Sequence, residues 1–295
     1  LDLKTVGITG SSGKTSTKDL TTSILRQKFN VTATQGNLNN HFGVPFTLLD
    51  ANSTHEIAVV EMGMSHPGEI EILAELAAPD VAIITNIGTA HIEFMETQEA
   101  IAKEKGMLAE AIPDDGHVIL SAHDEFSDSI AERSRAEVIT AGIECGDLQA
   151  RNVRMTAERT DFDLFWSGEQ EPTSISVTGR HMVRNAVLSA AAGVSLGIPI
   201  RQVAAGLKSA QLTSGRLELK SAGNLKFLDD SYNANPDSMR AALQTLSELE
   251  IPGRRIAILG LMAELGEQAE SEHIQLGRTA MENQIDLVYA MGTEG

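Results

Sequence analysis

Residues 8–15 read Ile-Thr-Gly-Ser-Ser-Gly-Lys-Thr, directly after the β-type run 5–8 and directly before a helical pattern. A glycine-rich loop between a strand and a helix allows its backbone N–H groups to point at phosphate oxygens. Lys14 adds a positive charge to such a loop, and the hydroxyl of Thr15 can hold Mg²⁺. The sequence therefore predicts a phosphate loop that binds a nucleotide, in preference to a glycine turn that only caps a helix.

The spacing of the two glycines in this loop is unusual. Gly10 and Gly13 are separated by two serines, whereas the general motif has four residues between its glycines. This spacing indicates a particular subset of phosphate-loop enzymes. The residues expected to surround the phosphates are Thr9, Gly10, Ser11, Ser12, Gly13, Lys14 and Thr15.

The composition limits the class of protein. A chain of 295 residues is long enough for two domains, each with its own core. The formal net charge of −18 argues against nucleic acid or an anionic membrane as a partner, because both would be repelled. Cys145 is the single cysteine, so no intrachain disulfide can form, and we expect a cytoplasmic location. We expect a monomer. The chain begins with leucine and stops just after an apolar run, so we also expect that it is a fragment of a longer protein.

Apolar β-type runs alternate with helical patterns in the first part of the chain, which is typical of a mostly parallel sheet with helices on both faces. We expect strands at 5–9, 57–61, 81–87, 117–121 and 137–141, and helices near 14–28, 67–77, 97–112 and 125–134. The short alternating segments of 147–178 predict a small antiparallel β appendage. Helices follow at about 181–196 and 199–208.

A second α/β series begins at the turn residues 213–216. Its expected elements are strands 216–220, 225–229, 255–260 and 286–290 and helices 236–248 and 268–283. The predicted fold class is therefore α/β. A central phosphate-loop domain occupies 1–212 in this prediction, and an incomplete, Rossmann-like second domain occupies 213–295.

Polar side chains just past apolar strands are candidates for chemistry, because ligands of open α/β sheets collect at the carboxyl ends of the strands. Glu61 ends one such run, where its carboxylate could coordinate Mg²⁺ or hold a metal-bound water. His91 follows the run 81–87, where it could bind metal or orient another group. The alternatives are that Glu61 is a solvated residue at the end of a strand and that His91 is an ordinary loop residue.

Lys105 lies in the apolar stripe of the expected helix 97–112, together with Ile101 and Leu108. No acid three or four positions away can pair with it, whereas Lys103 has a glutamate one turn back. Burial favours the neutral amine, which is a nucleophile. Reaction of that amine with CO₂ would give a carbamate able to bind metal. The alternative is a lysine that reaches out to solvent from the helix edge.

The phosphate loop, Glu61, His91 and Lys105 together resemble the active site of the Mur ligases, ATP-dependent enzymes that form amide bonds in peptidoglycan synthesis. The segment Lys105-Gly106-Met107-Leu108 is similar to the lysine segment of that family. The resemblance implies ATP as the nucleotide and catalytic roles for Lys14, Glu61, His91 and Lys105. It further implies that Thr15 serves one Mg²⁺, while Glu61, His91 and a CO₂-derived carbamate on Lys105 serve a second.

Three further segments, 36–45, 61–69 and 229–236, resemble one branch of this family. The substrates of that branch are UDP-N-acetylmuramoyl-tripeptide and D-alanyl-D-alanine, which the resemblance implies as partners. The residues implied to face these substrates are Asn37, Asn40, Tyr232, Asn233 and Asn235. A turn and a cap before Pro236 explain the asparagines near it equally well.

The resemblance also assigns residues to the nucleotide. It places Asn185 at the adenine, Arg216 at the phosphates of ATP, and Asp230 at the ribose. Met182 departs from the family, which often has asparagine at that position. The adenine assignment is therefore the one most affected by the difference.

The family has an N-terminal domain that holds the UDP-sugar and a complete C-terminal domain. The resemblance implies that this chain lacks the first and truncates the second, so we expect the fragment alone to be inactive. Two other functions stay open. A ligase such as a folylpolyglutamate synthase shares the phosphate loop and the lysine, whereas a phosphate-loop kinase or a noncatalytic nucleotide-binding protein would use Glu61 with Mg²⁺ but would not require Lys105.

Overall fold

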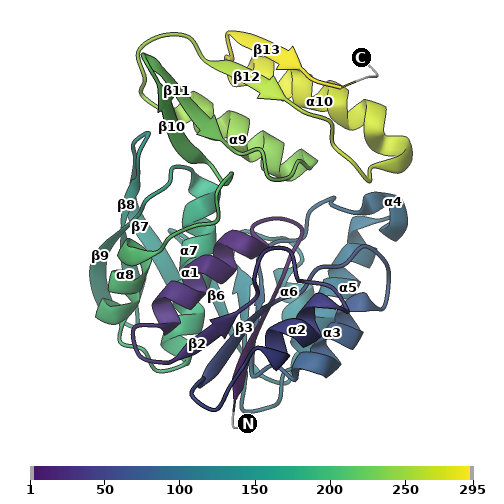
Figure 1. Ribbon diagram of the computed structural model, residues 1–295, viewed down its shortest axis with the longest axis vertical. Coiled ribbons are helices and arrows are strands. Elements are labelled where there is room, and N and C mark those ends of the chain that lie inside the picture. Colours follow the sequence, from purple (N-terminus) through teal and green to yellow (C-terminus); the bar gives the residue numbers. More distant parts are fainter. Residues whose placement is uncertain (1–2, 293–295) are drawn as a thin grey trace.

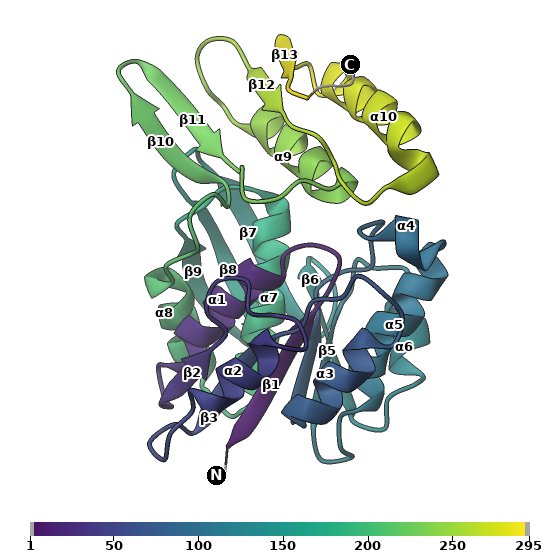
Figure 2. The same cartoon turned by 45° about the vertical axis from the view of Figure 1, so that its right-hand side comes forward.

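The computed structural model describes residues 3–292, which form a larger α/β body and a smaller second part (Figures 1 and 2). One nine-stranded sheet runs through the body. Its strands are β1 (Lys4–Thr9), β2 (Val31–Ala33), β3 (Ile57–Glu61), β4 (Val81–Ile84), β5 (His117–Ser121), β6 (Glu137–Ile143), β7 (Leu148–Met155), β8 (Thr160–Trp166) and β9 (Glu169–Ile175). The order is β2-β3-β1-β4-β5-β6-β7-β8-β9. The pairs from β2 to β7 are parallel and the last two are antiparallel, which confirms the predicted α/β class.

Helices cover both faces of this sheet (Figure 1). On one face α1 (Lys14–Leu25), α7 (Arg180–Ser195) and α8 (Ile200–Ser209) pack together, and on the other face lie α3 (Glu69–Ala77), α5 (Gln98–Glu110) and α6 (Ser127–Ala131). The parallel strands are apolar on both sides, so Val81 and Ile83 enter one core while Ala82 and Ile84 enter the other. The carboxyl ends of β1, β3 and β4 therefore have fixed positions at one edge.

The second part lies across that edge in both views (Figures 1 and 2). Its elements are β10 (Glu218–Ala222), β11 (Leu225–Asp229), α9 (Pro236–Glu248), β12 (Ile256–Leu259), the 3₁₀ helix η1 (Gly266–Gln268), α10 (Ala269–Glu282) and β13 (Leu287–Ala290). β10 and β11 form an antiparallel hairpin, and β12 pairs in parallel with β13. Buried residues of this part, such as Met262 and Leu265, belong to the same core as Ile92 and Met95 of the body.

Several local features differ from the sequence-based expectations. The strand expected at 81–87 ends at Ile84, because Thr85 and Asn86 turn away to bond with the phosphate loop. The short elements β2, α2 (Gly43–Leu49) and α4 (Ile92–Met95) were not predicted, since three to seven residues are too few to establish a period. The antiparallel segment is present, and it continues the main sheet because β7 pairs with β6.

No helix among the described residues combines the length and apolar character that a membrane span needs.

Candidate active site

The phosphate loop joins the end of β1 to the start of α1 through residues 10–13. Gly10 and Gly13 have φ angles of 149° and 79°, which side chains rarely adopt. A Cβ atom at Gly10 would overlap the Thr85 hydroxyl, and one at Gly13 would lie 2.6 Å from Asn185 Oδ1. No side chain caps the first turn of α1, so its backbone N–H groups are available to an anion.

The segment after β4 holds this loop in place. Thr85 Oγ1 donates to Ser12 O at 2.6 Å, and Ser12 N donates to Asn86 Oδ1 at 2.9 Å. Ser11 Oγ accepts a bond from Gly88 N at 2.8 Å. Sequence reasoning missed Thr85 and Asn86, although their position just past an apolar strand was the available signal.

Lys14 and Glu61 lie within electrostatic reach of each other beside the loop. Lys14 Nζ donates to Gly10 O at 2.7 Å. Burial lowers the pKa of Lys14, the Glu61 carboxylate opposes that change, and Arg216 adds to it. Glu61 is 2% exposed, and its Oε1 accepts a bond from Asn39 Nδ2 at 2.9 Å. Its Oε2 is buried without a hydrogen-bond partner among the described residues, which is costly unless a ligand pairs with it.

Lys105 is buried in α5, with 1% of its surface exposed, so the solvent-reaching alternative is wrong. Burial lowers its pKa well below the ordinary value, Lys14 contributes in the same direction, and Glu104 opposes both. The carboxylate of Glu104 accepts bonds from Gly68 N at 2.9 Å and Ile70 N at 2.8 Å at the start of α3. Lys103 is exposed. The charge of Lys14 in the phosphate loop therefore acts on the buried amine of Lys105.

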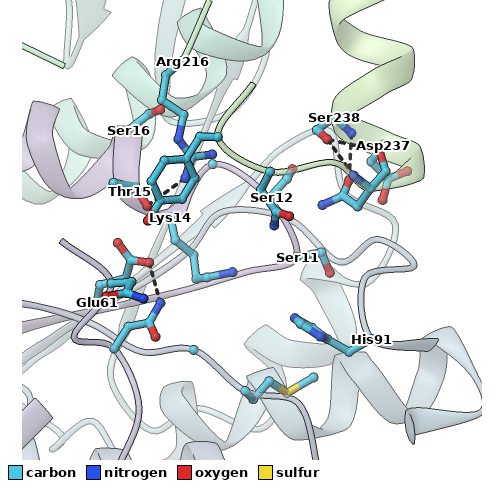
Figure 3. Close-up of a pocket in the computed structure, with 18 of the residues that line it drawn as sticks. Ser11, Ser12, Lys14, Thr15, Ser16, Glu61, His91, Arg216, Asp237 and Ser238 are labelled. Atoms are coloured by element: carbon cyan, nitrogen blue, oxygen red, sulfur yellow. Dashed lines mark hydrogen bonds between the residues drawn. The ribbon is translucent and has the colours of Figure 1, made fainter. Parts of the chain in front are cut away.

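His91 precedes α4 and faces the same site (Figure 3). Its Nδ1 contacts Oε2 of Glu264, which lies between β12 and η1 in the second part. Burial lowers the pKa of His91, and so do the charges of Lys14 and Lys105, while Glu264 opposes the change. Sequence reasoning missed Glu264, since no local pattern marks a contact between residues 173 positions apart.

One cavity of about 730 Å³ is lined by both parts of the chain. The predicted residues that line it are Ser11, Ser12, Gly13, Lys14, Thr15, Asn37, Asn40, Glu61, His91, Asn185, Arg216, Asp230, Tyr232, Asn233 and Asn235. Thr9, Gly10 and Lys105 lie outside this lining. In the view of Figure 3, Lys14 extends between Glu61 and His91. Asp237, at the start of α9, also lines the cavity and was not predicted.

Outside the phosphate loop, the residues assigned to the nucleotide come from α7, from the segment before β10 and from the position just after β11. Asn185 of α7 is buried beside Gly13, and Arg216 Nη2 donates to Thr15 Oγ1 at 3.2 Å. The Arg216 guanidinium lies 4.2 Å from the centre of the Tyr232 ring. Burial raises the pKa of Asp230 to about 6, against the effects of the Leu217 N–H and Arg216.

Three of the predicted substrate asparagines have structural partners. Asn40 Oδ1 accepts bonds from the N–H groups of Phe42 and Gly43, and Asn233 Oδ1 accepts one from Ala234 N. Asn235 Oδ1 accepts from Ser238 N at 2.8 Å, and Ser238 Oγ accepts from Asn235 N at 3.1 Å. This reciprocal pair caps α9, so the cap explanation is confirmed for Asn235.

The donor groups fit Mg²⁺ only with help from further ligands. Among residues 3–292, no three His, Cys, Asp or Glu side chains gather as a metal site. The unpartnered Oε2 of Glu61 and the hydroxyl of Thr15 are nevertheless the hard oxygen donors that Mg²⁺ prefers. Phosphate oxygens or a carbamate on Lys105 would complete such a set, since Mg²⁺ commonly combines one or two carboxylates with substrate phosphates.

Comparison with known proteins gives two family matches that cover most of the chain. The Mur ligase middle domain matches residues 8–193, and the Mur ligase, glutamate ligase domain matches residues 215–295. The predicted domain division at 212/213 falls between the two matched stretches.

Individual relatives match over nearly the whole chain. It is 38% identical to UDP-N-acetylmuramoyl-tripeptide--D-alanyl-D-alanine ligase of Bacillus subtilis (strain 168), over 100% of this chain and 64% of that protein. The crystal structure of MurF from Acinetobacter baumannii is similar with a TM-score of 0.95 and 36% identity, over 99% of this chain and 64% of that one. MurF ligase from Thermotoga maritima in complex with ADP has a TM-score of 0.87 and 29% identity, over 98% and 66%. The chain spans about two thirds of their length, and it belongs to the Mur ligase family.

Proposed function

We propose that this chain supplies the ATP-binding and C-terminal parts of a cytoplasmic enzyme that joins D-alanyl-D-alanine to UDP-N-acetylmuramoyl-tripeptide in peptidoglycan precursor synthesis. The observation that carries the proposal is a cavity lined by the phosphate loop, Glu61 and His91, with Lys105 buried in the neighbouring helix α5. The same chain is 38% identical over its whole length to a ligase of that name. The ADP bound to the T. maritima relative supports ATP as the nucleotide.

The proposed reaction has two steps. The terminal carboxylate of the tripeptide attacks the γ-phosphate of ATP, which gives an acyl phosphate and ADP. The amine of D-alanyl-D-alanine then attacks the acyl carbon and loses a proton, and inorganic phosphate leaves as the amide forms.

Within this proposal, Lys14 and Arg216 offset the negative charge of the phosphates. Asn185 contacts the adenine and Asp230 contacts the ribose. Thr15 would hold one Mg²⁺, while Glu61, His91 and a carbamate on Lys105 would hold a second. Mg²⁺ would add charge neutralisation at the transferred phosphoryl group. Asn37, Asn40, Tyr232, Asn233 and Asn235 are proposed to face the other substrates.

The environment of Lys105 supports the carbamate. Only a neutral amine reacts with CO₂, and burial keeps this amine neutral at a lower pH than a solvated lysine. A carbamate replaces the cation with an anion, which the nearby charge of Lys14 favours. A kinase or a noncatalytic nucleotide-binding protein would not require Lys105, so detection of the carbamate would favour the ligase.

Product analysis tests the function. The full-length enzyme that contains this chain is incubated with ATP, Mg²⁺, the UDP-linked tripeptide and D-alanyl-D-alanine, and its products are identified by mass spectrometry. The expected products are the UDP-linked pentapeptide, ADP and free phosphate. A phosphorylated product would support a kinase, and amide formation with glutamate and a folate substrate in place of these would support a folylpolyglutamate synthase.

A further inference from the structure

The contact between His91 and Glu264 joins the two parts of the molecule at the rim of the cavity. His91 belongs to the loop before α4, and Glu264 belongs to the turn between β12 and η1. The imidazole uses Nδ1 for this contact. Nε2 has no recorded partner among the described residues, and His91 lines the cavity.

The backbone around this contact shows that both residues are held in place. His91 and Glu264 have φ angles of 67° and 60°, an uncommon region for residues other than glycine. Glu93 N donates to Glu264 O at 3.3 Å, and a Cβ atom at Gly266 would lie 3.2 Å from Glu93 Cγ. The turn therefore approaches α4 closely through its backbone as well as through the Glu264 side chain.

Apolar packing supports the same approach. Leu265 and Met262 are 3% and 2% exposed, and they share one core with Ile92 and Met95 of α4. A second carboxylate from the C-terminal part contacts the same loop, because Asp237 Oδ2 accepts a bond from Thr89 N at 3.1 Å. The loop that carries His91 is thus fixed from two sides by the C-terminal part.

This geometry has a specific consequence for a histidine that binds metal. Such a histidine commonly donates its other ring N–H to a carboxylate, which fixes the tautomer and the direction of the ring. A bond from Nδ1–H to Glu264 leaves the lone pair of Nε2 as the donor to a cation. We propose that Glu264 is a positioning residue, which orients His91 for metal binding only when the C-terminal part is docked on α4.

The proposal links metal binding to the docking of the C-terminal part, and it rests on the second metal site of the proposed function. If docking orients a ligand, metal binding favours docking by the same free energy. A merely structural contact would stabilise the docked arrangement but would not change the state of the imidazole. The ring tautomer and the metal affinity therefore distinguish the two roles.

The test measures Mn²⁺ binding in the presence of ADP by electron paramagnetic resonance, with Mn²⁺ in place of Mg²⁺. Glu264→Ala should weaken Mn²⁺ binding by about 10- to 100-fold. Glu264→Gln keeps an acceptor oxygen and should lose less. Glu267→Ala is the matched control, because Glu267 is exposed in the same turn and its side chain makes no hydrogen bond or ion pair with a described residue. Far-UV circular dichroism and ADP affinity show that each variant is folded.

The double variant decides whether Glu264 acts through His91. His91→Ala should weaken Mn²⁺ binding, and adding Glu264→Ala to it should cause no further loss. In ¹⁵N spectra the Nδ1–H form of His91 should dominate in the wild type and decline in Glu264→Ala. Equal Mn²⁺ affinity of Glu264→Ala and wild type, or fully additive losses, would overturn the proposal. If His91→Ala itself leaves Mn²⁺ binding unchanged, the metal set of the proposed function fails as well, so the two failures are distinguishable.

Discussion

The two parts of the molecule that meet at the candidate site are built in different ways. On the phosphate-loop side, Glu61 and Lys105 are 2% and 1% exposed, and the large sheet and α5 hold them. On the opposite side, the Glu264 side chain is 42% exposed and stands on a turn. Charges in a buried, preorganised setting act strongly, whereas charges on a docked surface depend on how two parts meet. The comparison predicts that substitutions on the phosphate-loop side lower the reaction rate most. Substitutions on the Glu264 side should mainly change how the C-terminal part docks on the body.

The largest effect is expected from Lys14, at the centre of the buried side. Lys14→Met removes the ammonium group beside the phosphate loop and should lower the rate of ligation on the order of 10³-fold. Phosphate release in the presence of both substrates measures this rate. Thermal unfolding should change little or improve, because a buried charge is removed. A rate within ten-fold of wild type would contradict the prediction that the phosphate-loop side supplies most of the catalysis.

Two lysines of α5 provide a matched pair. In the full-length enzyme, Lys105→Ala should lower the ligation rate by at least about 10²- to 10³-fold, because no carbamate can form, and added bicarbonate should not restore it. Lys103→Ala changes an exposed residue two positions away and should leave the rate unchanged. A ¹³C signal from labelled bicarbonate should appear in the wild type and in Lys103→Ala only. Normal turnover of Lys105→Ala would refute the assignment.

Asp230 tests how much stability the C-terminal part loses by burying a charged carboxylate. Its pKa in the folded protein is about 6 against an ordinary 3.8, so the folded state favours the protonated form. Protonation of Asp230 therefore stabilises the folded state. This contribution is complete below pH 3.8 and is lost as the pH rises through 6. Asp230→Asn should therefore raise stability at pH 7 by up to about 3 kcal/mol, while it weakens binding of ATP. Urea unfolding at pH 4 and pH 7 measures the difference, and an equal gain at both values would contradict this origin.

The smallest effect is expected from the helix cap of α9. Asn235→Ala removes the side-chain half of the capping box and should cost about 1 kcal/mol of unfolding free energy. Asn233→Ala is the control, since the Asn233 amide oxygen accepts only the N–H of its neighbour Ala234. Thermal unfolding of the two variants sharpens the comparison. A larger loss from Asn233→Ala would mean that the segment before α9 matters more than its cap.

The sequence was informative where a signal is local. The phosphate loop is a contiguous motif, and the apolar runs of 57–60 and 81–87 predicted that Glu61 and His91 lie at the same edge of the sheet. Burial of Lys105 followed from the helical stripe around it. Short elements such as β2 and α4 escaped prediction because three or four residues are too few to establish a repeating pattern.

By itself, the sequence determined the α/β class, the nucleotide loop and the residues that its buried side presents, because each follows from spacing along one segment. Only the tertiary structure decided that Glu264 meets His91 and that Asp237 meets Thr89, contacts that span 173 and 148 positions. Such pairs depend on where the C-terminal part docks on the body. At that junction Leu265 and Met262 share one buried core with Ile92 and Met95 of α4, and no local pattern encodes such a shared core.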